Sequence, residues 1–336
     1  MSTSGSTMTD ITLRPFDPAV DMAAAAGLLF TVNEHDEVDW RPTEATLADE
    51  WQPSPRFDPA VDVILAWSGD TLVGLAEADW RKRGEAVTHE VHVVVHPTWR
   101  RRGIGRRLLG EIESHAGRVA RTLARTDGLE HRLTTFFEPA VPGAEAFATM
   151  AGYRPHTYGF LMRRQLDAPV ADAPLPAGLE VRAVTPDQHR VIWDADTEAF
   201  LDHDEPAERL ESDYQKWFGM THLDTSLWRV AWAGDEVAGS VMTFIWPEEN
   251  EAMGIRRAWL EHVSVRRPWR RIGLASALIA DTLRMLQAMG MEDAVLGVHG
   301  ENPTGAVGVY ERAGFAIHKR WVLWRKDLAD GQPRRT

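Results

Sequence analysis

The hydrophobic and polar positions repeat the same order of patterns twice along the chain. Each copy opens with an alternating strand pattern, ITLRPF from Ile11 and LEVRAV from Leu179. Two apolar segments separated by a Gly-Asp turn follow, which predicts a β-hairpin. A β-branched strand then leads into a segment with apolar residues three and four apart, which predicts an amphipathic helix. Because these blocks recur in the same order, we infer a tandem duplication.

The duplication predicts two α/β domains, each an α+β mixed sheet flanked by helices. Residues 10–167 form the N-terminal domain and residues 178–330 the C-terminal domain. Residues 168–177 are rich in alanine and proline without helical or strand periodicity, which is typical of a linker. A chain of 336 residues with 44 % hydrophobic residues is large enough for two cores.

Composition excludes several classes of protein. The chain has no cysteine, so disulfides, thiolate metal sites and a thiol nucleophile are excluded. A net charge of −13 argues against a nucleic-acid-binding surface and suits a cationic substrate, although solvation alone explains it equally well. No apolar run is long enough to span a membrane. We predict a cytoplasmic protein and, since no His/Asp/Glu set has metal-ligand spacing, no metal.

Both copies carry a glycine motif between the β-branched strand and the helix. The sequences are VVHPTWRRRGIG from Val94 and SVRRPWRRIGLA from Ser264. Glycine lets the backbone approach an anion closely, and a strand-to-helix turn directs several N–H groups to one point. The arginines add positive potential. The motifs match neither a nucleotide P-loop nor a dinucleotide fingerprint, so we predict another phosphate or pyrophosphate site.

At these residues the chain resembles the GNAT superfamily of acyl-CoA-dependent N-acyltransferases, over both halves. Arg100-x-x-Gly103-x-Gly105 and Arg270-x-x-Gly273-x-Ala275 resemble the pyrophosphate loop of that family, and ENPTGAVGVYERAGF (residues 301–315) resembles its second motif. The tandem arrangement is similar to the two-domain acetyltransferases of the mycothiol synthase type. The resemblance implies splayed sheets and acetyl-CoA as the acyl donor. It assigns cofactor contacts to Val263, Ser264, Val265, Arg270, Arg271, Ile272, Gly273, Leu274, Ala275, Ser276 and Asn302, and to Val93, Val94, Val95, Arg101, Arg102, Gly103, Ile104, Gly105 and Arg106.

The same resemblance gives the C-terminal domain its candidate catalytic residues. Tyr310 stands where the family places its general acid; a core tyrosine is the structural alternative. Asn302 would contact the cofactor or cap the helix. We predict Glu261 as the general base, because apolar neighbours would raise its pKa, and His262 or a water chain is the alternative. In the absence of a bulge, strand alternation places Glu261 and His262 on opposite faces.

The N-terminal domain departs from the family in its second motif. Ala148 stands at the position of Tyr310 and Ala140 at that of Asn302. Alanine can neither protonate a thiolate nor hydrogen-bond the cofactor. The pyrophosphate loop is intact, so this domain is predicted to bind acyl-CoA without catalysis or to be structural. Glu90 and His92 are the residues that could act as a base there.

The sequence therefore predicts an acetyl-CoA-dependent N-acetyltransferase acting on a primary amine of a small molecule, with no nucleic-acid or membrane partner. The acetyl group would pass directly to the amine, without a covalent enzyme intermediate. Two alternatives stay open: a non-catalytic acyl-CoA-binding protein, and an acetyltransferase for protein or peptide amines. The acceptor and the oligomeric state are not determined by the sequence.

Overall fold

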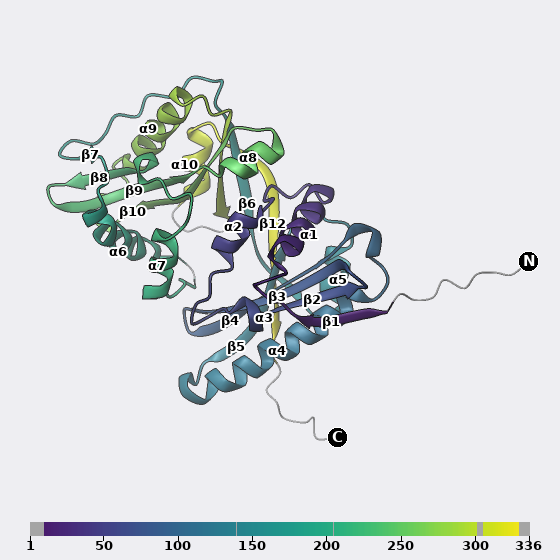
Figure 1. Cartoon of the computed structure of the whole chain (residues 1–336). Coiled ribbons are helices and arrows are strands. Elements are labelled where there is room, and N and C mark those ends of the chain that lie inside the picture. Colours follow the sequence, from purple (N-terminus) through teal and green to yellow (C-terminus); the bar gives the residue numbers. More distant parts are fainter. Residues whose placement is uncertain (1–9, 139, 204, 301–304, 329–336) are drawn as a thin grey trace, which may run out of the picture. The chain divides into compact units, whose positions relative to one another are not determined.

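The computed structural model describes residues 10–138, 140–203, 205–300 and 305–328 (Figure 1). The chain divides into two compact units. Of the described residues, the first unit contains 10–136, 140–154 and 325–328, and the second contains 137–138, 155–203, 205–300 and 305–324.

The first unit is built on five strands in the order β1-β2-β3-β4-β5. Neighbouring strands are antiparallel except for β4 and β5, which are parallel. The strands are β1 (Ile11–Pro15), β2 (Val63–Ser68), β3 (Thr71–Arg83), β4 (Ala86–Val95) and β5 (Glu130–Phe137). The helices are α1 (Met22–His35), α2 (Glu44–Glu50), α3 (Pro59–Asp62), α4 (Ile104–Asp127) and α5 (Ala144–Met150).

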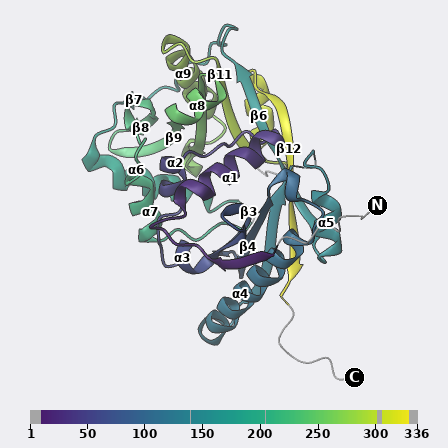
Figure 2. The same ribbon diagram turned by 45° about the vertical axis from the view of Figure 1, so that its right-hand side comes forward.

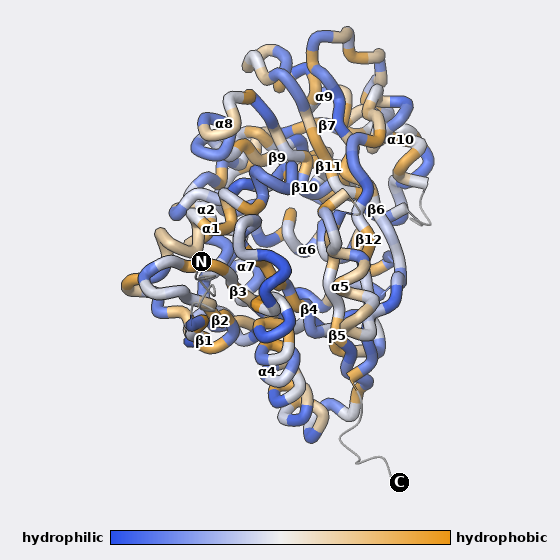
Figure 3. The backbone as a smooth tube through the Cα atoms, turned by 90° about the vertical axis from the view of Figure 1, so that its right-hand side faces the viewer, coloured by the Kyte–Doolittle hydropathy of each residue, from blue (hydrophilic) through white to orange (hydrophobic). Residues whose placement is uncertain are grey.

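Helices cover both faces of this sheet. On one face α1 and α2 pack on the strands through a cluster that includes Leu29, Leu47 and Leu65 (Figures 1 and 2). On the other face α4 buries Leu108 and Ile112 completely. Figure 3 shows α4 alternating between hydrophobic and hydrophilic stretches, as an amphipathic helix does on a sheet.

The second unit has seven strands in the order β12-β6-β11-β10-β9-β8-β7. They are β6 (Arg154–Gln165), β7 (Glu180–Arg182), β8 (Arg229–Ala233), β9 (Glu236–Phe244), β10 (Arg257–Val265), β11 (Asp293–His299) and β12 (Ala316–Asp327). Its helices are α6 (His189–Phe200), α7 (Glu211–Phe218), α8 (Pro247–Met253), α9 (Leu274–Ala288) and α10 (Ala306–Arg312). Apolar clusters of described residues pack on both faces of its sheet: one joins α9 and α10 to the sheet, and another joins α6 and α7 to the opposite face.

Strand β6 belongs to the first copy of the repeat by sequence, yet it completes the sheet of the second unit. It is antiparallel to β11 along the whole of that strand, from the pair Asp293–Gln165 to the pair His299–Gly159. β12 crosses the division in the other direction, since its residues from Arg325 count with the first unit. The limits of the compact units therefore differ from the limits of the sequence copies. The reason is that a strand at the end of a copy belongs to the unit whose strands it pairs with, whatever its place in the chain. The domain limits drawn from the sequence stay a prediction.

Candidate active site

The two glycine loops have the same backbone conformation. Gly103 and Gly273 are the residues that precede α4 and α9, with φ angles of 82° and 91°. Arg101 and Arg271 also have positive φ angles, 65° and 62°. Positive φ angles are unusual for arginine, and their recurrence shows that the two turns share the same backbone conformation. The first N–H groups of each helix lack intrahelical partners and are available to an anion.

The first arginine of each motif holds its loop in shape. Arg270 donates from Nε to the carbonyl oxygen of Val265 at 2.9 Å, and from its guanidinium to Asp202 Oδ2 at 2.5 Å. In the first unit Arg100 makes the same two bonds, to Val95 at 3.1 Å and to Asp36 at 2.8 Å. Hydrogen bonds from Arg267 and Arg270 lower the pKa of Asp202 far below its usual range. Arg270 is thus engaged within the protein, which gives it a loop-shaping role.

The other residues of the loops differ in accessibility. Leu274 and Ile104 are buried and anchor their helices, so only their main chains are open to a ligand. Ala275, Ser276 and Gly105 are half-buried at the helix starts. The exposed members are Arg271, Ile272, Gly273, Arg101, Arg102, Gly103 and Arg106.

The strand before each loop separates from its parallel neighbour. The ladder between β10 and β11 joins residues 257–259 to residues 293–295. Beyond it, Val263, Ser264 and Val265 pair only with β9 in the ladders formed by β10. In the first unit the ladder between β4 and β5 ends at Glu90 and Thr134. The main-chain groups of β10 that face the gap are consequently open to the amide groups of an extended ligand such as pantetheine, as the resemblance implies.

A β-bulge at Glu261 changes which side chains share a face of β10. Leu260 pairs with Thr243 and His262 pairs with Met242, so Glu261 is the extra residue. His262 therefore lies on the same face as Trp259, and Val263 lies on the α9 face with Leu260. This reverses the arrangement expected for an unbulged strand. Glu261 is exposed, whereas the sequence predicted apolar surroundings for it.

His262 is held by a buried aspartate of α6. Its Nδ1 lies 2.7 Å from Oδ2 of Asp196, whose side chain is fully buried. Arg209 donates to the same oxygen at 2.8 Å. Burial alone would raise the pKa of Asp196, but the neighbouring His262 and Arg209 lower it to about 2. The ring of His262 also stacks on Trp217, with ring centroids 4.7 Å apart.

Asp196 and Arg209 were not identified from the sequence. They lie between the first strand and the hairpin of the second copy, in a region without a recognisable motif. No local pattern marks an aspartate on α6 as the partner of a histidine on β10, because only the packing of the helix on the sheet brings them together.

Tyr310 lies on α10 inside the apolar cluster of α9. Its exposed fraction is 7 %, and its ring meets Phe315 edge-on with ring centroids 6.2 Å apart. Burial raises the pKa of its hydroxyl to about 12. A tyrosine in this state keeps its proton at neutral pH and can donate it. Asn302 lies outside the described residues.

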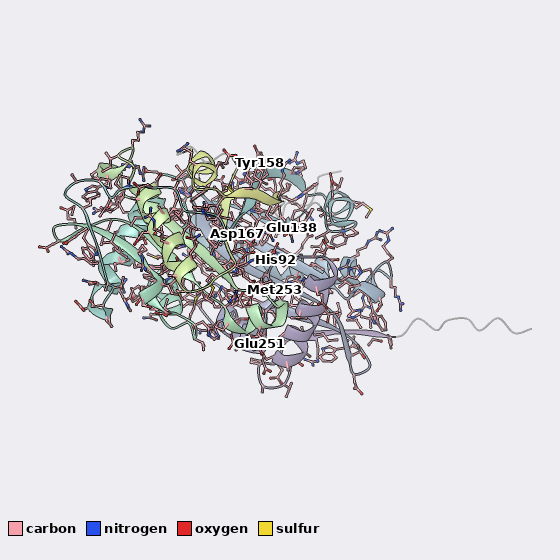
Figure 4. The ribbon with its side chains drawn as sticks, turned by 90° about the horizontal axis from the view of Figure 1, so that it is seen from above. His92, Glu138, Tyr158, Asp167, Glu251 and Met253 are labelled. Atoms are coloured by element: carbon pink, nitrogen blue, oxygen red, sulfur yellow. The ribbon has the colours of Figure 1, made fainter. Side chains whose placement is uncertain are left out.

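The first unit has a different set of groups at the corresponding place. Ala148 is buried where Tyr310 stands in the second copy. His92 (labelled in Figure 4) lies on β4 with Nε2 3.0 Å from Oε1 of Glu90, and it pairs across the strands with Glu77. Burial lowers the pKa of His92, but Glu90, Glu77 and Asp79 outweigh it and raise the value to about 9. Burial raises the pKa of Glu77 to about 7.

The carboxyl group of Glu77 makes the stability of the protein depend on pH. Its pKa is about 7 in the folded protein and 4.5 for an unperturbed group, so its favourable contribution is complete below pH 4.5 and is lost as the pH rises through 7. Glu77→Gln is expected to raise the free energy of unfolding at pH 8 by about 1–3 kcal/mol, at about 1.4 kcal/mol per pKa unit reduced for partial exposure. The amide oxygen can still accept the bond from Trp51. Urea unfolding at pH 4.5 and pH 8 measures the free energy of unfolding, with a substitution of the exposed Glu85, Glu85→Gln, as control. An equal increase in the free energy of unfolding at both pH values would contradict the prediction.

Among the described residues, no group of three or more His, Cys, Asp or Glu side chains could hold a metal ion. Among those residues there is also no helix long and apolar enough to cross a membrane. The cytoplasmic location stays a prediction.

Comparison with known proteins agrees with this geometry. The model of the acetyltransferase (GNAT) family matches residues 29–153 and again residues 189–315. The chain therefore belongs to the GNAT family, with two GNAT regions in tandem. It is an N-acetyltransferase that uses acetyl-CoA as its acyl donor.

Relatives of known name span most of the chain. The mycothiol acetyltransferase of Salinispora arenicola is 31 % identical over 265 residues, covering 78 % of this chain and 80 % of its own. That of Streptomyces scabiei is 28 % identical over 314 residues, covering 92 % and 94 %.

Solved structures share the fold. A GCN5-related N-acetyltransferase from Sphaerobacter thermophilus superposes with a TM-score of 0.70 at 24 % identity, covering 96 % of this chain and 97 % of its own. A tandem GNAT protein of the clavulanic acid biosynthesis pathway superposes with a TM-score of 0.67 at 20 % identity, covering 96 % and 100 %.

Proposed function

We propose that the second unit transfers the acetyl group of acetyl-CoA directly to the primary amine of a small molecule, in the manner of the mycothiol acetyltransferases. The observation that carries this proposal is that Tyr310, the glycine loop and the gap between β10 and β11 occur together in the second unit. In the first unit Ala148 replaces the tyrosine.

The reaction needs three contributions from the protein. An alkylammonium group has a pKa near 10 and must lose a proton before it attacks. Glu261 is the base named by the sequence, with His262 as the alternative. A main-chain N–H of β10 near Val265 would polarise the thioester carbonyl. Tyr310 would protonate the departing thiolate of CoA.

The glycine loop and the preceding strand would contact different parts of acetyl-CoA. The N–H groups that follow Gly273 would hold the pyrophosphate, with Arg271 contributing charge, and the main chain of Val263–Val265 would bind the pantetheine amides. Gly103 and Val93–Val95 offer the same features in the first unit, so we propose that it binds acyl-CoA without transferring the acetyl group.

An assay of CoA release tests this proposal. Acetyl-CoA would be incubated with small primary amines, amino-sugar conjugates, aminoglycosides and peptides, and one class of small amine is expected to respond. Ala275→Asp and the matched Gly105→Asp would be assayed in parallel. An aspartate in the first helical turn is compatible with the helix dipole but repels a bound pyrophosphate. We expect Ala275→Asp to lower the rate at least about tenfold more than Gly105→Asp.

Other results of this assay would change the proposed acceptor, the proposed activity or the unit that catalyses. A response to peptides alone would replace the small-molecule acceptor by a protein or peptide amine. Silence of the wild type with every amine, with acetyl-CoA still bound, would favour an acyl-CoA-binding protein. A larger loss in Gly105→Asp would move catalysis to the first unit.

A further inference from the structure

We propose that His262 is the general base of the acetyl transfer and that Asp196 positions it, in place of the exposed Glu261. The inference rests on the proposed function and deepens it, because it assigns the group that removes the proton from the acceptor. Three observations support this assignment: the β-bulge at Glu261, the contact between His262 and Asp196, and the unsatisfied oxygen of Asp196.

The bulge places His262 where a base is needed. It lies in the part of β10 that has separated from β11, one residue before the Val263–Val265 segment. Because Glu261 is inserted as an extra residue, the imidazole turns to the face covered by α6 and α7. His262 is 19 % exposed, so its ring is mostly enclosed and still accessible.

The contact with Asp196 determines which ring nitrogen can accept a proton. Nδ1 of His262 donates to Oδ2 of Asp196 across 2.7 Å. Nε2, on the opposite edge of the ring, is then the basic nitrogen. The rings of Trp217 and Phe200, with centroids 4.7 Å and 5.1 Å from that of His262, hold the imidazole in place. This arrangement of imidazole and buried carboxylate is the one by which enzymes orient a histidine base.

The carboxylate of Asp196 is buried with one oxygen unsatisfied, which is unfavourable and which a purely structural role does not explain. Oδ2 of Asp196 accepts from both His262 and Arg209, whereas Oδ1 is buried with no hydrogen-bond partner among the described residues. Leaving a buried acceptor unsatisfied destabilises the folded protein, and more so for a charged group. Holding His262 in one orientation gives this buried carboxylate a function.

The proton balance is complete with these groups. Nε2 of His262 takes one proton from the ammonium, and the freed lone pair forms the C–N bond at the thioester carbon. As the C–S bond breaks, the electron pair on sulfur takes the proton of Tyr310. The second proton of the nitrogen restores the tyrosine by exchange through solvent, and the imidazolium releases its proton to solvent. One proton is released for each N-acetyl product and each CoA thiol.

Replacement of the imidazole is the direct test, with the amine that gives the highest rate in the wild type. His262→Gln is expected to lower kcat/KM for this amine by roughly 10²-fold, within the usual contribution of a general base, while the Kd for acetyl-CoA is unchanged. Asp196, which contacts the ring, and Arg209, which shares its carboxylate oxygen, stay in this variant.

Chemical rescue separates a catalytic role from a structural one. Added imidazole is expected to restore turnover of His262→Ala with saturation, because a free imidazole can occupy the vacated space and accept the proton. His222→Ala, which removes an imidazole that pairs with Glu248, is the matched control: it is expected to keep the wild-type rate and to gain nothing from imidazole. Asp196→Asn is expected to lower kcat about tenfold or more without changing the KM for acetyl-CoA, as loss of an orienting group does.

The outcomes distinguish this inference from the proposed function. An active wild type with His262→Gln within about threefold of it, a change of less than 1 kcal/mol in transition-state stabilisation, would overturn only the assignment of the base. A loss in His262→Ala that imidazole does not restore, with acetyl-CoA binding intact, would give His262 a structural role and overturn it equally. A wild type silent with every amine would reject the proposed function itself.

Discussion

Tyr310→Phe is expected to lower kcat by roughly 10²-fold and to leave the Kd for acetyl-CoA unchanged. The substitution removes one oxygen from a side chain that is 7 % exposed and keeps its ring against Phe315. Since burial raises the pKa of the hydroxyl to about 12, the proton is present throughout the range of a normal assay. Its loss leaves the CoA thiolate to depart without a proton donor.

Single-turnover and steady-state measurements of CoA release check this expectation. Tyr214→Phe on α7, a tyrosine outside the proposed site, is the matched control and is expected to keep the wild-type rate. Because the pKa of Tyr310 is raised, its deprotonation should not limit the wild-type rate below about pH 10. Retention of full activity by Tyr310→Phe would contradict its role as the acid and leave it as a core residue.

Asp293→Ala is expected to lower the free energy of unfolding by about 3–5 kcal/mol, the range found when one partner of a buried ion pair is removed. Asp293 and Arg257 face each other on β11 and β10, with exposed side-chain fractions of 8 % and 4 %. Two hydrogen bonds join them, Nε to Oδ1 at 2.9 Å and a terminal nitrogen to Oδ2 at 3.0 Å. Without the carboxylate the guanidinium stays buried beside a cavity.

The double variant Arg257→Met/Asp293→Leu separates charge from packing. It fills a similar volume without ions and is expected to recover most of the lost stability, because apolar replacement of a buried pair is often neutral. Thermal and urea unfolding of the single and double variants measure both effects. The pair lies in the short ladder from which β10 and β11 separate, so we also expect weaker acetyl-CoA binding in Asp293→Ala. A loss below about 1 kcal/mol would show instead that water reaches the arginine.

The repeated loops show how far local sequence determines structure. Each glycine motif follows a strand and starts a helix, as predicted, because positive φ angles and close backbone approach restrict the residue types that can occupy such a turn. The mixed sheet flanked by helices and the GNAT family were likewise identified from the sequence. Arg270 shows the limit of the motif: its position was predicted, but its bonds to Asp202 and Val265 depend on segments distant in the chain.

The sequence alone determined the duplication, the two glycine turns and the candidate tyrosine, because each is encoded in a short segment or in its recurrence, and the resemblance of these segments to the GNAT family indicated the acyl donor. The tertiary structure decided three further points. It paired β6 with β11 across the sequence division, placed a bulge at Glu261, and brought Asp196 to His262. Strand pairing, register and the contact between helix and sheet are all set by the free energy of packing residues far apart in the chain, and no local pattern of residues carries that information.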